Sequence, residues 1–144
     1  MSIKQISVFL ENRPGTLHKM TSVLAEHSVD MRAMSLAETK DFGIARIIVD
    51  DVIEATNVLK EADFVASITP VLAYEIPDEP GGLNKILGCF TDTRVNVEYM
   101  YAFLGGKEKN HACMIFRVAD TKTAEAALAG KGLKSMTQED IQSI

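Results

Sequence analysis

The chain has 144 residues, of which 47% are hydrophobic and 24% are charged, enough for one average domain or two very small ones. Its formal net charge of −5 argues against nucleic-acid binding, because a phosphate-binding surface needs an excess of Lys and Arg. There is no apolar run of about 18 residues and no signal-peptide pattern at the N-terminus, so we expect a cytoplasmic protein that does not enter a membrane.

The first half of the chain predicts a strand, a helix, two strands, a helix and a strand, in that order. Residues 4–10 are rich in strand-forming side chains. Pro14 then stands where a helix can begin, because the first helical residue needs no N–H donor. Leu17, Met20 and Leu24 recur after it at helical spacing. Further along, the pattern predicts strands at 29–38 and 43–51, a helix at 52–62 and a strand at 64–69.

The second half repeats this order. It predicts a strand at 71–76, a helix at 83–90, strands at 95–104 and 111–120, a helix at 123–130 and a weak strand at 133–136. Gly15 aligns with Gly81 at an offset of 66 residues, and Asp51 aligns with Asp120 at an offset of 69. The change of offset indicates a three-residue insertion near 104–111. The chain is therefore an internal duplication.

The order β-α-β-β-α-β, present twice, is that of the ferredoxin-like unit. We therefore predict an α+β fold with two ferredoxin-like repeats, at 1–70 and 71–144, whose antiparallel sheets are paired side by side. A lone half of this size would be marginal, so the two halves should support each other.

The predicted strand at 29–38 carries apolar residues on both faces. Strict alternation places Met31 and Ala33 on one face, and Met34 and Leu36 on the other. Helices cover only one side of such a sheet, so apolar surface remains on the other side. Apolar surface of this kind favours a homodimer.

A Pro-Gly turn joins the first strand to the first helix in each half. It reads ENRPGTL at Glu11–Leu17 and DEPGGL at Asp78–Leu83. With SVDMRAM at 28–34 and RVNVEYM at 94–100, this turn resembles the ACT domain, a small-molecule sensor attached to many amino-acid metabolic enzymes. The resemblance covers essentially the whole chain, and makes the two predicted repeats ACT-type units.

The resemblance implies an amino acid held between two ACT units. The loop after the first strand comes from one unit, and the start of the second strand from the other. The family pattern favours Asn in the loop and at the start of the strand. Only one combination has both, namely the loop of the first repeat with Asn12 and the strand of the second repeat with Asn96. The predicted ligand-binding residues are Asn12, Arg13, Pro14, Gly15, Thr16, Leu17, Asn96, Val97 and Tyr99.

The chemistry of these residues suits a zwitterion. An Asn amide both donates and accepts hydrogen bonds, and the free amides at a helix start attract a carboxylate. Gly15 lets the backbone approach a ligand closely because it has no Cβ. Alternatively, Asn12 only caps the helix, as Asn does well.

The opposite combination, the loop of the second repeat with the second strand of the first repeat, predicts a weaker cleft. Its residues are Asp78, Glu79, Gly81, Gly82, Leu83, Asp30 and Met31. Because its loop is acidic, it should repel a carboxylate and suit a cation or no ligand.

Catalytic and metal-binding patterns are missing from the sequence. His18, His27 and His111 do not have metal-ligand spacing, and we find no catalytic triad, phosphate loop or dinucleotide fingerprint. The isolated Cys89 and Cys113 suggest buried reduced thiols. We therefore expect a non-catalytic amino-acid sensor without metal or cofactor. Its expected partners are a free amino acid, a second copy of the same chain in a homodimer, and a separate target enzyme. The alternatives are a ligand-free interaction subunit and a small enzyme on a ferredoxin-like scaffold.

Overall fold

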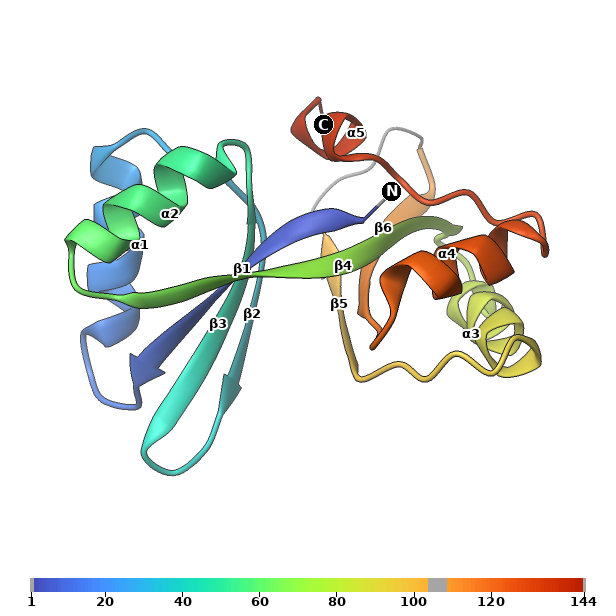
Figure 1. The fold of residues 1–144 in the computed structure, drawn as a ribbon, viewed down its shortest axis with the longest axis horizontal. Helices are drawn as coiled ribbons and strands as arrows, with labels where there is room; N and C mark the ends of the chain where they lie inside the picture. The colour runs from blue at the N-terminus through green and yellow to red at the C-terminus, as the bar shows by residue number, and fades with distance from the viewer. Residues whose placement is uncertain (1, 104–108, 144) are drawn as a thin grey trace. The chain divides into compact units, whose positions relative to one another are not determined.

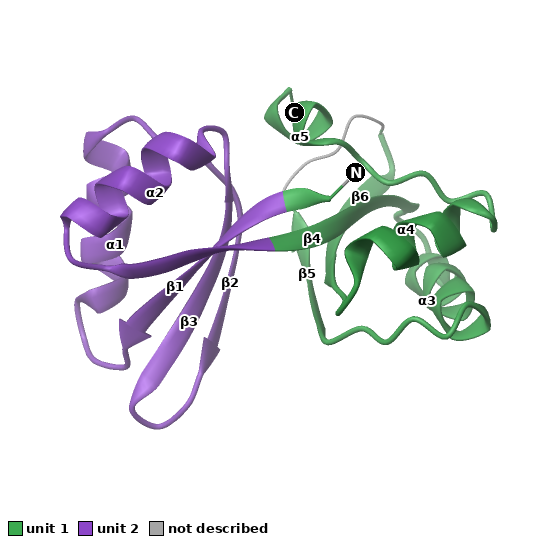
Figure 2. Cartoon of the chain, viewed as in Figure 1, with its two compact units in different colours: residues 1–3, 70–144 green, residues 4–69 purple. Residues whose placement is uncertain are grey.

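The computed structural model describes residues 2–103 and 109–143, which form two compact units (Figures 1 and 2). The N-terminal unit is Lys4–Thr69, drawn in purple in Figure 2. The C-terminal unit, drawn in green, contains residues 2–3 and the described part of 70–144. Most of the insertion expected at 104–111 lies outside the described residues. No described helix is long and apolar enough to cross a membrane.

The N-terminal unit has the predicted β-α-β-β-α-β order. Its elements are β1 (Ile3–Glu11), α1 (Thr16–Glu26), β2 (Met31–Glu38), β3 (Phe42–Val49), α2 (Val52–Glu61) and the first part of β4 (Val65–Pro77). The strands lie in the order β2-β3-β1-β4. β3 pairs antiparallel with both β1 and β2, and Glu11 at the end of β1 lies opposite Phe42 at the start of β3. This register brings the loop after β1 close to the β2–β3 hairpin.

The helices of the N-terminal unit cover one face of its sheet. Alternate residues of β1, namely Ile6, Val8 and Leu10, pack with Met20 and Leu24 of α1 in a buried core. The two-residue period of the strand and the helical spacing of α1 therefore meet on one face, as the sequence predicted.

The alternation predicted for 29–38 is wrong at one point. The register of β2 on β3 shifts between Met31 and Ala33, as in a β-bulge. Met31 packs against the core, whereas Ala33 lies opposite Ile48 on the other face. A strict period of two fails here because the bulge inserts one extra residue into an edge strand.

The C-terminal unit follows the same plan with differences at its end. It continues β4 and adds α3 (Gly82–Asp92), β5 (Tyr99–Phe103), β6 (His111–Arg117), α4 (Thr121–Ala129) and α5 (Gln138–Gln142). The strands lie in the order β4-β6-β5, with both pairings antiparallel. Its core contains Tyr74, Phe90 and Phe116. The rings of Phe90 and Phe116 are in edge-to-face contact, with 4.8 Å between their centroids.

The predicted strand at 133–136 does not form. The backbone N–H of Met136 donates to the carbonyl of Ala73 in β4, and the chain then enters α5, whose start is capped by Thr137. The strand predicted at 95–104 is also shorter, because the N–H of Val95 remains bonded to Phe90 at the end of α3. In both places the first residue of the predicted strand is bonded to the preceding helix end, Leu133 to Leu128 of α4 and Val95 to Phe90 of α3.

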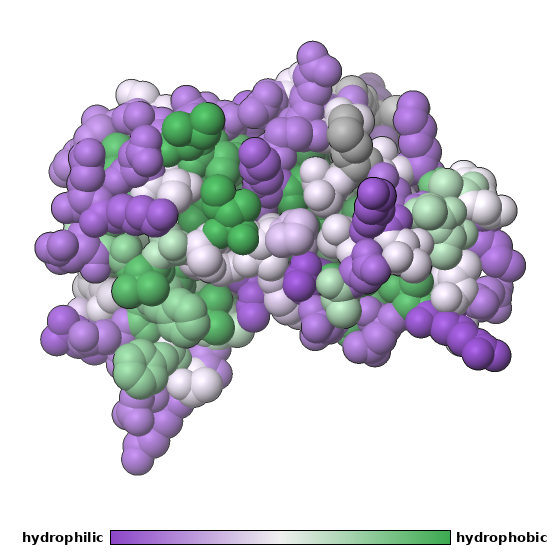
Figure 3. Space-filling model, in the orientation of Figure 1, coloured by the Kyte–Doolittle hydropathy of each residue, from purple (hydrophilic) through white to green (hydrophobic). Residues whose placement is uncertain are grey.

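Large apolar side chains remain exposed on the N-terminal unit. Phe9 is 51% exposed and Phe42 is 56% exposed. Phe9 points away from the helix-covered face because its neighbours Val8 and Leu10 belong to the core. Figure 3 shows hydrophobic surface over this unit, including the area around the tip of β1. The homodimer expected from such surface stays a prediction.

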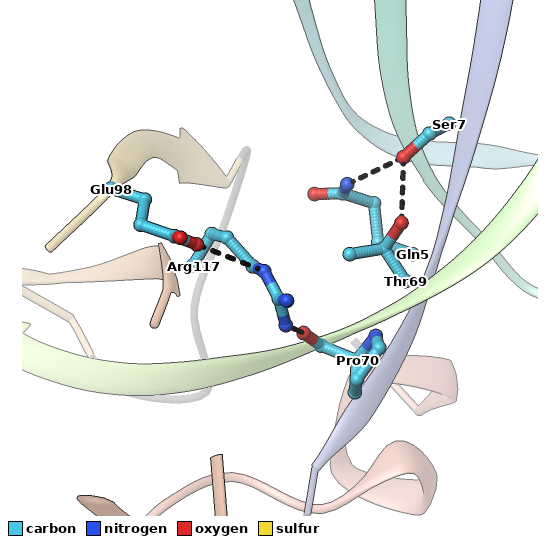
Figure 4. Close-up of polar contacts among 6 residues, drawn as sticks. All are labelled: Gln5, Ser7, Thr69, Pro70, Glu98 and Arg117. Atoms are coloured by element: carbon cyan, nitrogen blue, oxygen red, sulfur yellow. Dashed lines mark hydrogen bonds and ion pairs between the residues drawn. The ribbon is translucent and has the colours of Figure 1, made fainter. Parts of the chain in front are cut away.

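Polar contacts lie beside β4 in both units (Figure 4). In the N-terminal unit, the buried Ser7 hydroxyl accepts a hydrogen bond from Gln5 and lies 2.9 Å from the Thr69 hydroxyl. In the C-terminal unit, Arg117 donates to the Pro70 carbonyl at 2.7 Å and pairs with Glu98 at 3.2 Å. The strands predicted separately at 64–69 and 71–76 form one strand, β4, which runs through Pro70.

Candidate functional site

Both Pro-Gly turns build the same kind of helix start. The N-caps of α1 and α3 are Gly15 and Gly81, with φ of 87° and 84°, a conformation that favours glycine. No side chain caps either helix among the described residues. α1 begins at Thr16, so the expectation that Pro14 is its first helical residue is wrong. The Pro-Gly turn ends before the helix and leaves its first amides without a side-chain acceptor.

The second helix of each unit is different, because an aspartate caps it. Asp51 accepts a hydrogen bond from the Glu54 N–H, and Asp120 accepts one from the Thr123 N–H. The two caps have nearly identical backbone angles, with φ of −120° and −121°. These equivalent residues confirm the duplication. In both repeats, therefore, the first helix has no side-chain cap within the described part of the chain, and the second helix is capped by an aspartate.

Asn12 does not cap α1. Its side-chain amide donates to the Thr39 carbonyl at 3.0 Å and lies within 3.3 Å of a Glu38 carboxylate oxygen and 3.4 Å of the Lys40 carbonyl. Its backbone N–H donates to the Asp41 carbonyl at 2.9 Å. Asn12 therefore ties the loop to the β2–β3 hairpin, and the capping alternative is wrong.

A groove of about 890 Å³ opens beside the first Pro-Gly turn. We call it the loop groove. It lies where β1 ends and where β3, β4 and α1 begin, and all of its lining belongs to the N-terminal unit. The lining residues are Phe9, Leu10, Glu11, Arg13, Pro14, Gly15, Thr16, Lys19, Phe42, Ala62, Asp63, Phe64 and Val65.

Three phenylalanines from separate segments give the loop groove an aromatic wall. Phe9 comes from β1 and Phe42 from the start of β3, and both lie on the sheet face away from the helices. Phe64 comes from the turn before β4, lines the groove and also packs against the N-terminal core. The Lys19 ammonium lies 5.7 Å from the centre of the Phe64 ring, within range of a cation–π contact. Sequence reasoning missed this wall, although a large aromatic residue at the outward position of Phe9 was a possible signal.

Charged groups of both signs line the same groove. The guanidinium of Arg13 pairs with the Glu11 carboxylate at 2.9 Å, and Lys19 adds a second cation. Asp63 adds a second carboxylate and has a left-handed backbone with φ of 67°. The groove thus carries two anions and two cations, beside the uncapped start of α1.

The predicted ligand-binding residues are distributed over several places. Arg13, Pro14, Gly15 and Thr16 meet at the loop groove, whereas Leu17 packs against the core of the N-terminal unit. Asn96, Val97 and Tyr99 belong to the C-terminal unit. There Asn96 is exposed, Val97 packs against the core, and Tyr99 lies opposite Arg117 in the sheet.

The residues predicted for the weaker cleft also lie in both units. Asp30 and Met31 line a shallow pocket of about 400 Å³ beside α1, together with His18, and Asp30 pairs with Arg32 at 3.1 Å. In the C-terminal unit lie Asp78, Glu79, Gly81, Gly82 and Leu83. A Cβ at Gly82 would come within 2.2 Å of the Pro77 carbonyl oxygen, so the second turn closes tightly on the end of β4.

Buried titratable groups are held neutral in the C-terminal core. Burial, with a smaller effect of the Glu125 carboxylate, raises the pKa of Tyr74 to about 12. Burial and the Glu75 carboxylate raise the pKa of Cys113 to about 12, and its sulfur lies 3.2 Å from that of Met136. Within residues 2–103 and 109–143, no three His, Cys, Asp or Glu side chains are placed to hold a metal ion.

Comparisons with known proteins agree with this architecture. The chain is similar to protein BT0572 from Bacteroides thetaiotaomicron, with 35% identity, a TM-score of 0.91 and coverage of 100% of this chain and 98% of that one. Its fold is also similar to the regulatory subunit of aspartate kinase from Thermus thermophilus, with 18% identity, a TM-score of 0.65 and coverage of 90% of both chains. The regulatory subunit of aspartate kinase from Thermus flavus has 19% identity, a TM-score of 0.62 and coverage of 88% of both chains. No curated protein matches. The family model described as an ACT domain pair matches residues 1–144, and the chain therefore belongs to the ACT domain pair family.

Proposed function

We propose that this protein is a regulatory subunit that binds a free amino acid at the Pro-Gly turn of its first repeat and controls a separate enzyme. ACT domain pairs are regulatory, amino-acid-binding domains, which supports the general role. The choice of the first turn rests on the loop groove, because it places an uncapped helix start next to charges of both signs.

The arrangement suits the two ends of an amino acid. A carboxylate is stabilised by the first-turn amides that no described side chain caps and by the positive end of the dipole at the start of α1. Arg13 and Lys19 reinforce this attraction. The Asp63 carboxylate, which is unpaired among the described residues, attracts an ammonium group, and the Glu11 carboxylate, which pairs with Arg13, adds negative charge beside it. Because Gly15 has no Cβ and no atom within 4 Å of where one would stand, a ligand has space to approach the backbone there.

The second turn is a poorer binder of the same ligand. Its residues equivalent to Asn12 and Arg13 are Asp78 and Glu79, so a cationic side chain is replaced by an acidic one. Glu79 lies 3.8 Å from Lys85 and reduces the positive charge at that helix start. We propose that the first turn binds the amino acid. The contribution of Asn96, Val97 and Tyr99 to binding stays a prediction, tested by Asn96→Ala.

The test compares Gly15→Ala with the matched control Gly81→Ala. Both glycines have φ near 85° and open space at the Cβ position, so alanine should destabilise each helix start by about 1 kcal/mol. Ligands are found by thermal shift over the twenty amino acids, and affinities are measured by calorimetry. Gly15→Ala should abolish or strongly weaken binding, and Gly81→Ala should leave the affinity unchanged.

Equal loss of affinity in both variants would contradict the choice of the first turn. No stabilisation of the unaltered protein by any amino acid at millimolar concentration would instead favour the ligand-free interaction subunit. Under that second function, the exposed Phe9 and Phe42 would contact a partner protein.

A further inference from the structure

We infer that the loop groove selects an amino acid with an aromatic side chain. This inference rests on the proposed function and adds the class of ligand. It is based on the aromatic wall of Phe9, Phe42 and Phe64, and on a comparison of the two repeats within one chain.

The two repeats share the backbone around this position. The N–H of residue 12 bonds to the carbonyl of residue 41, and the equivalent N–H of residue 78 bonds to the carbonyl of residue 110. The turn after the second helix also matches, since the N–H of Phe64 bonds to Leu59 and that of Leu133 bonds to Leu128. Because the backbones match, side chains at equivalent positions of the two repeats can be compared directly.

The aromatic wall is present only in the first repeat. The positions equivalent to Phe9, Phe42 and Phe64 are occupied by Glu75, His111 and Leu133. The position equivalent to Val65 is occupied by Lys134. Phe9, Phe42 and Val65 are 51%, 56% and 67% exposed, so the repeat core does not require these apolar residues at the first groove. Exposed apolar side chains gathered around a cavity are typical of a binding site.

The carboxylate of Asp63, unpaired among the described residues, lies in the groove lining and supports a ligand with an ammonium group. The φ of 67° at Asp63 matches that of 82° at Gly132, the equivalent residue in the second repeat. Glycine adopts this conformation without strain, whereas other residues pay a conformational penalty there. Within the described part of the chain, the Asp63 carboxylate has no hydrogen bond or ion pair that would offset this penalty. The first repeat thus has an exposed, unpaired carboxylate at the edge of the aromatic wall, in a turn where the second repeat has glycine.

A free aromatic amino acid matches this combination better than an apolar protein surface does. Its ring contacts the exposed Phe9 and Phe42, its ammonium group is attracted to Asp63 and Glu11, and its carboxylate is attracted to Lys19 and the start of α1. A groove of about 890 Å³ is in the range of small-molecule sites. Aromatic pairs add favourable contacts beyond their buried area, so the wall should discriminate a ring from an aliphatic chain.

The experiment measures the affinity of L-phenylalanine, L-tyrosine, L-tryptophan, L-leucine and L-serine for the full chain by calorimetry. The three aromatic amino acids should bind about three- to tenfold more tightly than L-leucine, with no measurable binding of L-serine. N-acetyl-L-phenylalanine lacks the ammonium group and phenethylamine lacks the carboxylate, so both should bind at least about tenfold more weakly than L-phenylalanine.

Variants at exposed positions locate the ring. Phe42→Ala and the milder Phe42→Leu should both weaken L-phenylalanine binding, by about tenfold or more for alanine. The control His111→Ala, at the equivalent position of the second repeat, should have no effect. Circular dichroism and the urea midpoint check that each variant is folded.

Each other result overturns the inference in a distinguishable way. Binding of a non-aromatic amino acid that depends on Gly15 but not on Phe42 refutes the aromatic selection and leaves the proposed function standing. No binding of any amino acid refutes both. Self-association that Phe42→Ala abolishes, without any ligand response, would assign the groove to contacts between copies of the chain.

Discussion

Replacing Asp63 by Gly is expected to stabilise the protein while weakening its ligand affinity. Asp63 has φ of 67°, and a non-glycine residue in the left-handed region costs about 1–2 kcal/mol. Glycine removes this strain but adds about 0.4–1 kcal/mol of backbone entropy to the unfolded chain. The difference is a net stabilisation of about 0.5–1 kcal/mol. The backbone hydrogen bond from the Asp63 N–H to the Lys60 carbonyl remains possible in the variant.

The reverse exchange in the second repeat is the matched control. Gly132 has φ of 82° in the equivalent turn, so Gly132→Asp should destabilise the protein by a similar amount. Urea unfolding followed by circular dichroism measures both changes, as opposite shifts of the midpoint with an unchanged slope. For units of this size, about 0.5–1 kcal/mol corresponds to a few degrees in Tm.

Two results would refute the reasoning about Asp63. If Asp63→Gly lowers the urea midpoint, the aspartate is not strained in its turn. If the variant is more stable but binds L-phenylalanine with unchanged affinity, the Asp63 carboxylate does not contact the ligand. Stabilisation combined with a weaker affinity is the expected pattern of a residue kept for function at a cost in stability.

Asn12→Ala should speed amide hydrogen exchange in the turn between β2 and β3, measured by mass spectrometry, because it removes the donor to Thr39; unchanged exchange would contradict a tie between loop and hairpin. Tyr74→Phe should keep or raise the free energy of unfolding, since the Tyr74 hydroxyl is buried without a hydrogen-bond partner among the described residues, and a loss above about 1 kcal/mol in urea would reveal a missed partner. Hydrogen bonds from Thr123 lower the pKa of Asp120 in the folded protein. This cap therefore stabilises the fold fully at pH values above the ordinary Asp pKa of about 3.9, and the stabilisation is lost as the pH falls through the lowered pKa of the folded state. Asp120→Asn should flatten this acid dependence in pH-dependent urea titrations, and an unchanged pH profile would contradict it.

The duplication and the element order were predictable because their signals are local. Hydrophobic periodicity needs only a few consecutive residues, and the Pro-Gly turn recurs at the same place in both halves. The same locality explains the errors. Pro70 reads as a break between two strands, but Arg117, far away in the chain, bonds to its carbonyl within one continuous strand. The bulge at Arg32 depends on how β2 pairs with β3, which periodicity within one strand does not contain.

The candidate site divides in the same way. The turn from Arg13 to Thr16 was found from the sequence, because proline and glycine have backbone preferences that depend on the residue alone. The role of Asn12 was not found, since its partners lie in a hairpin about 27 residues further along the chain.

By itself, the sequence determined the two repeats, the positions of most helices and strands, and the first Pro-Gly turn as the region to investigate. Only the tertiary structure decided that Phe9, Phe42 and Phe64 line one groove beside this turn. The physical reason is strand register: pairing Glu11 with Phe42 brings the end of β1 to the start of β3, and side chains distant in sequence then face one cavity.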